Sequence, residues 1–194
     1  MRPGLALSLA VWMTCGVATA RGSEPASVAR SPRWAVRIEK PGLPNLHKVG
    51  DGYYRGAQPT SAGVRELAKL GVRTIVNLRA LHSDRRLIGD ASLSYEHIGM
   101  TALHAEDEDV VRFLRVVTDL RRQPVFVHCQ HGADRTGLMT AVYRIVAQRW
   151  SKDEAIREMT DGGFGYHSMF SGLVDYLRRT DLVALARTAG IRQK

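Results

Sequence analysis

The sequence predicts an α/β fold in which helices flank a single, mostly parallel central sheet. Short apolar runs typical of strands alternate with amphipathic helical segments, as in chains whose parallel strands are linked by crossover helices. The chain has 194 residues, and removal of a predicted export segment of 20 would leave 174, enough for one core. We therefore expect one domain at residues 49–194, preceded by an extended lead-in at residues 21–48 that is rich in Pro, Ser and Arg.

Residues 1–20 have the pattern of a secretory signal peptide. A charge at Arg2 is followed by an apolar run too short for a comfortable bilayer span, and Ala18-Thr19-Ala20 matches an A-x-A cleavage site. Cleavage after Ala20 would make the protein secreted or, in a bacterium, periplasmic, with no membrane span left. Two alternatives stay open: lipidation at Cys15, which the preceding residues fit poorly, and retention of the segment as an anchor.

Composition narrows the function classes. Cleavage would leave Cys129 as the one cysteine, so no intramolecular disulfide is expected, and a lone thiol in an exported chain indicates chemistry. The net charge of +9, or +8 without Arg2, favours anionic partners. Basic residues are not interleaved with aromatics in a stripe, which argues against nucleic-acid binding. We also see no metal-ligand cluster or nucleotide motif and expect no metal or cofactor.

The elements of the first half follow from local patterns. Residues 49–55 predict an entry strand that is interrupted by a turn at Asp51-Gly52. Residues 61–70 have one-sided helical spacing, and Gly71 is a natural helix end. Two strands follow, a central one at residues 74–78 and a more peripheral one at residues 93–98.

The second half continues the alternation. An apolar stripe from Val110 to Val117 predicts a helix of about 15 residues that ends near Arg122. Ser151 and Glu154 form a capping box for a helix that reaches about Thr160. The remaining elements are a strand at 124–127, a helix at 138–148, a glycine-rich loop at 161–167, and amphipathic helices at 169–179 and 181–189.

The segment at residues 128–137, His-Cys-Gln-His-Gly-Ala-Asp-Arg-Thr-Gly, lies between a predicted buried strand and a predicted helix. A strand, a short loop and a helix N-terminus together form an anion site, because loop amides and the positive helix end converge there. Cys129 begins the loop and Arg135 ends it, which pairs a nucleophile with a phosphate clamp. We expect phosphate contacts from Gln130, His131, Gly132, Ala133, Asp134, Arg135 and Thr136.

The same surroundings predict an activated thiol. A helix N-terminus and a neighbouring arginine lower a cysteine pKa below its ordinary value of about 8.5, so Cys129 should be mostly ionised at neutral pH. Thr136 follows the arginine, and its hydroxyl is placed to donate to the sulfur and to help it leave from an intermediate.

These residues carry a resemblance. His128 to Gly137 resembles the H-C-x5-R-[ST] signature of cysteine-based tyrosine and dual-specificity phosphatases. Tyr54-Arg55-Gly56-Ala57-Gln58-Pro59, followed by residues 70–79, resembles the atypical dual-specificity phosphatases of plants and fungi and their bacterial relatives. The resemblance covers residues 53–143 and implies a tyrosine phosphatase-like fold, Cys129 as the phosphocysteine nucleophile and Arg135 as the phosphate-binding arginine.

The resemblance further implies a metal-independent phosphomonoesterase, a hydrolase that acts on phosphoproteins or on inositol-phosphate-like substrates. Phosphotyrosine, phosphoserine or phosphothreonine, inositol polyphosphates and phosphoinositides all stay open. Other functions also stay open: a catalytically silent phosphate-binding module, and a rhodanese-like sulfurtransferase, whose loop is typically shorter. The sequence does not determine the oligomeric state, and we assume a monomer.

The general acid is expected at the sheet edge that holds the loop. A 15-residue helix spans about 22 Å and a five-residue strand about 17 Å, so the helix that precedes the strand begins near that edge. We choose Asp107 as catalytic acid, with Glu106 and His104 as substitutes. Asp134 is a second candidate, since its place resembles a loop aspartate of myotubularin phosphatases, but it is as well suited to orient Arg135 or the loop backbone.

Further residues are expected near the loop. Arg79, His82 and Asp84 follow the strand at 74–78 and should reach the same edge as Cys129, because ligands bind at the carboxyl ends of parallel strands. Phe164 and Tyr166 belong to the glycine-rich loop and either form a wall of the pocket mouth or cover the core, which we favour.

Overall fold

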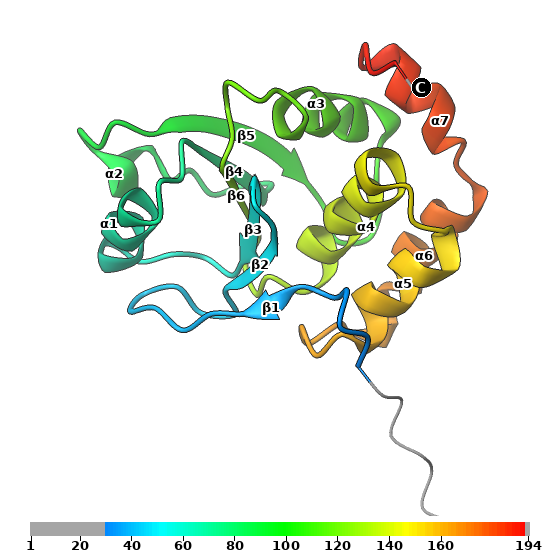
Figure 1. Ribbon diagram of the computed structural model, residues 1–194, viewed down its shortest axis with the longest axis horizontal. Helices are drawn as coiled ribbons and strands as arrows, with labels where there is room; N and C mark the ends of the chain where they lie inside the picture. Colours follow the sequence, from blue (N-terminus) through cyan, green and yellow to red (C-terminus); the bar gives the residue numbers. More distant parts are fainter. Residues whose placement is uncertain (1–29, 193–194) are drawn as a thin grey trace, which may run out of the picture.

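The central sheet has six strands in the order β1-β2-β3-β6-β4-β5 (Figure 1). Strands β3, β6, β4 and β5 are parallel, while β1 and β2 are added antiparallel at one edge. This computed structural model describes residues 30–192, so the predicted signal peptide lies outside the described residues. The strands are β1 (Val36–Arg37), β2 (His47–Gly50), β3 (Tyr53–Gly56), β4 (Thr74–Arg79), β5 (Ser94–Met100) and β6 (Val125–His128).

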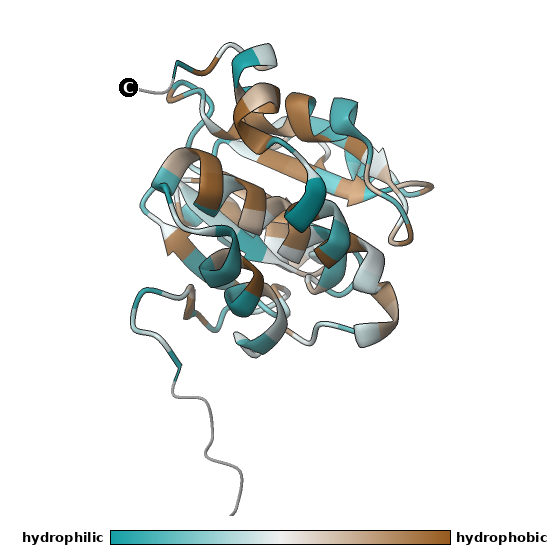
Figure 2. Cartoon of the chain, turned by 90° about the vertical axis from the view of Figure 1, so that its right-hand side faces the viewer, coloured by the Kyte–Doolittle hydropathy of each residue, from teal (hydrophilic) through white to brown (hydrophobic). Residues whose placement is uncertain are grey.

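Helices cover both faces of the sheet, which confirms the predicted fold class. Helices α1 and α2 lie on one face, and α3 to α7 gather on the other (Figure 1). Single helices carry both apolar and polar stretches, as amphipathic coverage requires (Figure 2). The helices are α1 (Ser61–Lys69), α2 (Arg85–Ile88), α3 (Asp107–Val117), α4 (Asp134–Gln148), α5 (Lys152–Asp161), η1 (Ser168–Phe170), α6 (Ser171–Arg179) and α7 (Leu182–Thr188). Between residues 30 and 192, none of them has the length and apolar character needed to cross a bilayer.

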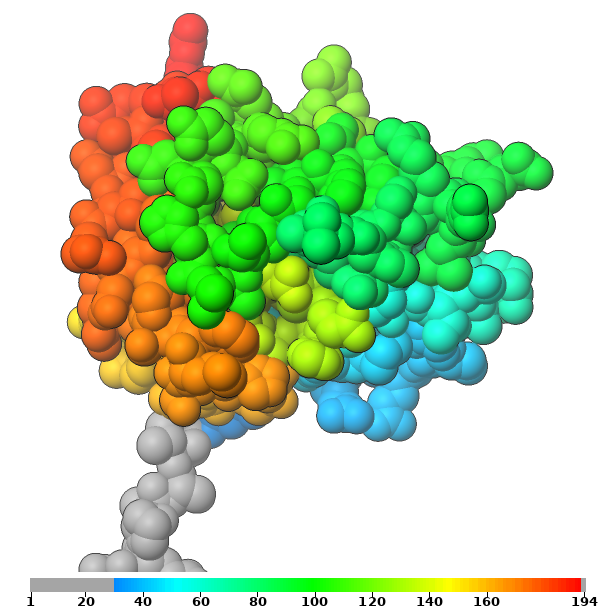
Figure 3. Space-filling view, turned by 180° about the vertical axis from the view of Figure 1, so that it is seen from behind, coloured from blue at the N-terminus to red at the C-terminus, as the bar shows by residue number. Residues whose placement is uncertain are grey.

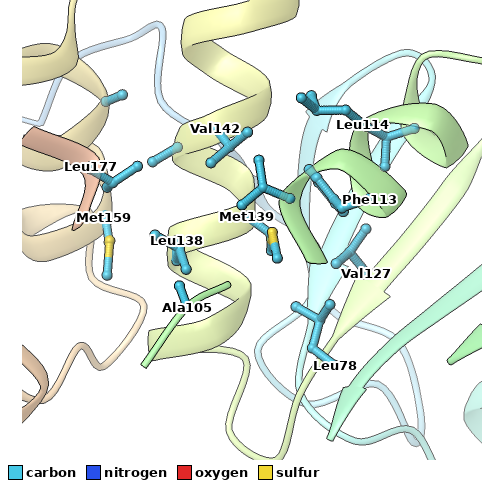
Figure 4. Packing of buried hydrophobic residues seen from close by; sticks show 14 of the residues in the cluster. Leu78, Ala105, Phe113, Leu114, Val127, Leu138, Met139, Val142, Met159 and Leu177 are labelled. Atoms are coloured by element: carbon cyan, nitrogen blue, oxygen red, sulfur yellow. The ribbon is translucent and has the colours of Figure 1, made fainter. Parts of the chain in front are cut away.

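Helix α4 is the central element of the larger layer. Its side chains Leu138 and Met139 are both fully buried, Leu138 on the side of Met159 and Met139 on the side of Phe113 and Val127 (Figure 4). A helix that is covered on two sides needs apolar residues around most of its circumference. Because α4 is wedged between the sheet and the outer helices, the loop that starts it is held on a rigid base.

Two predicted boundaries differ from the structure. Helix α4 begins at Asp134, four residues before the predicted start, because polar residues of the loop take part in its first turn. Helix α3 ends at Val117, well before Arg122. Just beyond that end, Asp119 Oδ1 accepts the backbone N–H of Arg121 at 3.0 Å, a local side-chain bond that competes with helix continuation.

The described part of the expected lead-in, residues 30–48, packs on the rest of the fold. Trp34 and Ala35 are buried, and the backbone N–H of Ala35 donates to Glu158 Oε1 at 2.7 Å. Strand β1 pairs with β2, so this stretch extends the sheet. Its apolar residues are isolated and aperiodic, which explains why local patterns predicted only an extended lead-in outside the domain.

Candidate active site

The loop around Cys129 connects β6 to α4. Strand β6 is buried throughout and lies between β3 and β4, and Cys129 at its end is only 2% exposed. Gly132 takes a φ of +70°, and a Cβ at that position would lie 2.5 Å from the carbonyl carbon and oxygen of Gly56. Glycine is therefore required both for the left-handed backbone and for the close approach to the end of β3.

Four consecutive carbonyl groups of this loop are held from behind. Gln130 accepts from the backbone N–H of Gln58 at 3.3 Å, and His131 accepts from Asn45 Nδ2 at 2.9 Å. The carbonyls of residues 132 and 133 both accept from Arg55 Nη2, at 2.7 and 3.4 Å. Since the N–H of a trans peptide points opposite to its C=O, the amides of residues 131–134 face the opposite side of the loop. That side is a cradle for an anion above Cys129.

Arg135 lies at the exit of the cradle. Its Nη1 donates to the carbonyl of Met100, the last residue of β5, at 3.2 Å. Its Nε is buried and has no hydrogen-bond partner within the described residues. A buried guanidinium donor requires an acceptor. A phosphate oxygen bound in the cradle would supply that acceptor, as expected for the clamp.

Thr136 does not make the expected contact. Its Oγ1 is buried and has no hydrogen-bond partner in the part of the chain that the structure describes, so it does not donate to the sulfur of Cys129. Thr136 belongs to the first turn of α4, so the helix backbone sets the direction of its side chain. Spacing in the sequence does not predict that direction.

A buried polar network stands behind the cysteine. His128 and Asp84 are both fully buried, and His128 Nε2 donates to Asp84 Oδ2 at 2.7 Å. Asp84 Oδ1 accepts from Gln58 Nε2 at 2.7 Å, and Gln58 Oε1 accepts from Arg79 Nη1 at 2.9 Å. Burial raises the pKa of Asp84, but the hydrogen bonds from His128 and Gln58 outweigh it and leave the pKa lowered.

This network confirms that Arg79 and Asp84 reach the edge of Cys129, and His82 Nε2 lies 3.5 Å from Asp84 Oδ1. The predicted site residues omitted His128. The sequence did contain a signal for His128, namely its position at the end of a buried strand directly before the cysteine. A buried histidine there requires a hydrogen-bond partner, which the end of a neighbouring strand can supply.

Asp134 joins the loop to the glycine-rich segment. Its carboxylate is 5% exposed and accepts the backbone N–H of His167 at 2.9 Å and, through Oδ2, the ring Nδ1 of His167 at 2.9 Å. The ring of His167 lies 5.8 Å from that of His131, centroid to centroid, at the outer side of the cradle. An aspartate that accepts these bonds from His167 acts as a fixed support, which fits the role of orienting the loop backbone.

Asp107 begins α3 and is exposed. The hydroxyl of Tyr176 in α6 donates to its Oδ1 at 2.6 Å, which fixes the carboxylate. Glu106 is paired with His104, whose Nε2 lies 3.2 Å from Glu106 Oε1. The segment that leads to Asp107 follows β5, whose final carbonyl binds Arg135, so it starts at the cradle's edge. Asp109 is a further carboxyl on this helix, and its pKa is raised by burial.

The outer surface shows the loop between several segments. In the space-filling view its lime-coloured atoms reach the surface between green residues near 100 and orange residues near 168 (Figure 3). Phe164 is buried, with the Arg55 guanidinium carbon 3.8 Å from its ring centroid, so it covers the core as we favoured. Tyr166 is partly buried against the same core.

A buried cysteine under an amide cradle, with an arginine at the exit of the loop, defines the class of cysteine-dependent phosphatases on this α/β fold. Comparison with known families gives the same result. A family model described as "DSP-PTPase phosphatase fused to NAD+ Kinase" matches residues 45–169, and the chain belongs to this family of dual-specificity and tyrosine phosphatases. The resemblance read from the signature motif is confirmed, and the chain is a cysteine-dependent phosphatase.

Individual relatives agree with the family. The chain is 36% identical over 160 residues to dual specificity protein phosphatase TpbA of Pseudomonas aeruginosa, covering 82% of this chain and 72% of that protein. A crystal structure of that TpbA in complex with pTyr has a TM-score of 0.73 at 34% identity, and covers 83% of this chain and 98% of that chain. Inositol diphosphatase DSP2 of Oryza sativa subsp. japonica is 27% identical over 114 residues, which is 55% of each chain.

Proposed function

We propose that the chain hydrolyses phosphate monoesters of proteins, phosphotyrosine among them, through a phosphocysteine intermediate on Cys129. The outward orientation of the carbonyls of residues 130–133 carries this proposal, because it leaves the loop amides directed at an anion above the buried sulfur. The similarity to TpbA, whose structure is known with phosphotyrosine, supports this substrate.

The reaction proceeds in two displacements. The Cys129 thiolate attacks phosphorus, so that a sulfur–phosphorus bond forms while the ester oxygen–phosphorus bond breaks. Arg135 and the loop amides stabilise the equatorial oxygens, and an acid protonates the leaving oxygen. Water then attacks phosphorus, its proton returns to the carboxylate, and inorganic phosphate leaves as the thiolate re-forms.

Replacement of the nucleophile tests the proposal. Cys129→Ser should lower turnover of p-nitrophenyl phosphate by at least about 10³-fold, because a neutral hydroxyl is a far weaker nucleophile than a thiolate. The variant should still bind inorganic phosphate, measured by calorimetry, since the cradle amides and Arg135 stay in place. Turnover by Cys129→Ser equal to that of the wild-type protein would refute a phosphocysteine mechanism.

We propose Asp107 as the general acid. Its place at the start of α3 and its fixed carboxylate support this role. Asp107→Asn should lower kcat at least about 10²-fold for phenyl phosphate, whose leaving group needs a proton, and far less for p-nitrophenyl phosphate. The basic limb of the pH profile should also vanish.

Two matched substitutions complete this test. Asp109→Asn removes the neighbouring carboxyl of α3, and Asp134→Asn removes the candidate in the loop. The basic limb should persist in both variants. If the basic limb is lost in Asp109→Asn or Asp134→Asn and persists in Asp107→Asn, the replaced residue of that variant is the acid and the assignment to Asp107 is wrong.

Inositol phosphates are a second substrate class that one surface feature favours. A hollow of about 770 Å³ lies beside the cradle, since Gln58 lines it and also bonds the loop carbonyl of Gln130. Its lining includes the basic residues His82, Arg85 and Arg86, which suit additional phosphate groups. A panel of phosphopeptides and inositol phosphates, compared by kcat/KM, distinguishes the classes, and Arg85→Ala should reduce only the turnover of the inositol phosphates.

We further propose that the protein is exported and that the folded part acts as a monomer in the periplasm or outside the cell, without nucleic-acid partners. The signal-like pattern of residues 1–20 supports export. Mass spectrometry of the exported protein should give Arg21 as the first residue. A lipid on Cys15 or an intact N-terminus would instead establish one of the two alternatives.

A further inference from the structure

Arg55 is a fully buried cation directly behind the cradle. It is the third residue of β3 and has no exposed surface. Burial lowers the pKa of its guanidinium to about 10, which still leaves it charged at neutral pH. No carboxylate lies within ion-pair distance of Arg55 in residues 30–192, in contrast to the other buried arginine, Arg144, which is paired with Glu158 at 2.6 Å.

The contacts of Arg55 are with the catalytic loop. Nη2 donates to the carbonyls of Gly132 and Ala133, and the guanidinium carbon lies over the ring of Phe164, 3.8 Å from its centroid. Nε and Nη1 are buried without any hydrogen-bond partner among the described residues. A buried guanidinium with only carbonyl and ring contacts is costly unless negative charge develops nearby.

Negative charge does develop on the other side of the loop. The thiolate of Cys129 and the phosphate dianion above it lie across the peptides whose carbonyls Arg55 holds. The charge of Cys129 is one of the influences that favour the charged form of Arg55, after those of Tyr53 and Glu158. Burial raises the pKa of Tyr53 and keeps its phenol neutral at pH 7, and Glu158 is already neutralised by Arg144. The thiolate and the bound phosphate are therefore the charges that the guanidinium has left to stabilise.

We propose that Arg55 is a positioning residue of the phosphate loop that also stabilises the Cys129 thiolate from behind. Its Nη2 holds two carbonyls outward, so that the amides of the same peptides face the phosphate. Its charge acts through the loop at short range and in surroundings with little water, where electrostatic interactions are strong. Two cations therefore act on the bound phosphate: Arg135 contacts it directly, and the fully buried Arg55 acts through the loop. This inference rests on the phosphocysteine site proposed above.

Two substitutions separate the roles of Arg55. Arg55→Met removes charge and donors at similar length, and Arg55→Lys keeps the charge but removes the guanidinium whose Nη2 reaches both carbonyls. The control is Arg144→Lys, which changes the other buried arginine, far from the loop in its contacts. The remaining charged groups around Cys129 stay unchanged in all variants: Arg135, Asp134 with His167, and His128 with Asp84.

Two measurements on the whole protein read out the roles. The first is the pH dependence of iodoacetamide alkylation, followed by mass spectrometry on the peptide that contains Cys129. The second is the inhibition constant of inorganic phosphate against p-nitrophenyl phosphate. Arg55→Met should raise the alkylation midpoint by about one pH unit or more and weaken phosphate inhibition at least about tenfold. Arg55→Lys should keep the midpoint near that of the wild-type protein and weaken inhibition by phosphate at least about threefold.

A folded Arg55→Met protein with wild-type midpoint and inhibition constant would overturn the inference. If Arg55→Met does not fold, Arg55→Lys decides, because unchanged phosphate inhibition in that variant contradicts the positioning role. Arg144→Lys should lose stability without a change in either measurement, and an equal change there would show that loss of any buried arginine suffices. A wild-type protein that binds phosphate and has a low alkylation midpoint, but does not turn over substrate, would contradict the proposed function alone.

Discussion

Gly132 is the residue whose replacement disturbs the cradle most directly. Any side chain there is strained by the left-handed backbone and also collides with the end of β3. Gly132→Ala should therefore lower kcat/KM for p-nitrophenyl phosphate at least about tenfold, together with a loss of about 1–3 kcal/mol in the free energy of unfolding. Enzyme kinetics and urea denaturation measure the two effects.

Gly71→Ala is the matched control, since Gly71 has a φ of +75° but open space around it. This control should lose about 1 kcal/mol of stability and no activity. Equal losses of activity in both variants would mean that backbone strain, and not the contact with Gly56, sets the loop geometry.

The sequence predicted the reacting residues better than their supports. Cys129 and Arg135 were found because strand, loop and helix follow one another within a dozen residues. Arg55 and Asn45 were not assigned a role, because they contact the loop from 77 and 86 residues away in the chain. Local patterns contain no information on such contacts, and the hydrogen bonds of a buried arginine depend on the assembled fold.

At the level of elements, periodicity placed most strands and helices, and the errors have physical causes. The helix after the loop starts early because Asp134, Arg135 and Thr136 are polar yet helical, so the apolar period begins later than the helix. β1 and the residues around Trp34 were missed since two-residue strands and single buried aromatics have no period.

Strand β2 carries a histidine that should make stability depend on pH. His47 is 3% exposed, and burial lowers its pKa from 6.5 to about 4. Between these two values the unfolded chain binds a proton on His47 that the folded protein excludes. The free energy of unfolding is therefore unaffected by this group above pH 6.5 and decreases as the pH falls from 6.5 toward 4. From pH 7 to 5 the wild-type protein should lose about 2 kcal/mol more than His47→Phe, measured by urea denaturation.

The exposed His104 provides the comparison for this effect. His104→Phe should keep the full wild-type pH dependence, because the His104 side chain is 71% exposed and its removal leaves the buried His47 unchanged. A His47→Phe protein with an undiminished loss of stability between pH 7 and 5 would show that other groups cause the acid sensitivity.

For the whole molecule, the buried pair of Arg144 and Glu158 is the principal polar connection. Both side chains are nearly inaccessible, and the pair joins α4, α5, the carbonyl of Val49 in β2 and the backbone N–H of Ala35. Glu158→Gln leaves the guanidinium charge uncompensated and should reduce the free energy of unfolding by about 3–5 kcal/mol. Urea denaturation with a two-state fit measures this loss.

The control for this pair is Glu154→Gln on the same helix. Glu154 pairs with the exposed Arg33 at 2.8 Å, so its replacement should cost less than about 1 kcal/mol. Similar costs for the two substitutions would mean that water reaches the Arg144 pair, contrary to its burial.

The support of the loop by residues 45–58 links ligand binding to folding. The hydrogen bonds that turn the loop amides inward come from Asn45, Arg55 and Gln58, which flank or belong to the β2–β3 hairpin, so occupancy of the cradle and packing of this hairpin against the loop reinforce each other. Hydrogen exchange in β2 and β3 should therefore slow when inorganic phosphate is added. In a phosphate-rich medium the product of the reaction would then stabilise the folded enzyme against proteolysis, and phosphate starvation would make the same molecules easier to degrade.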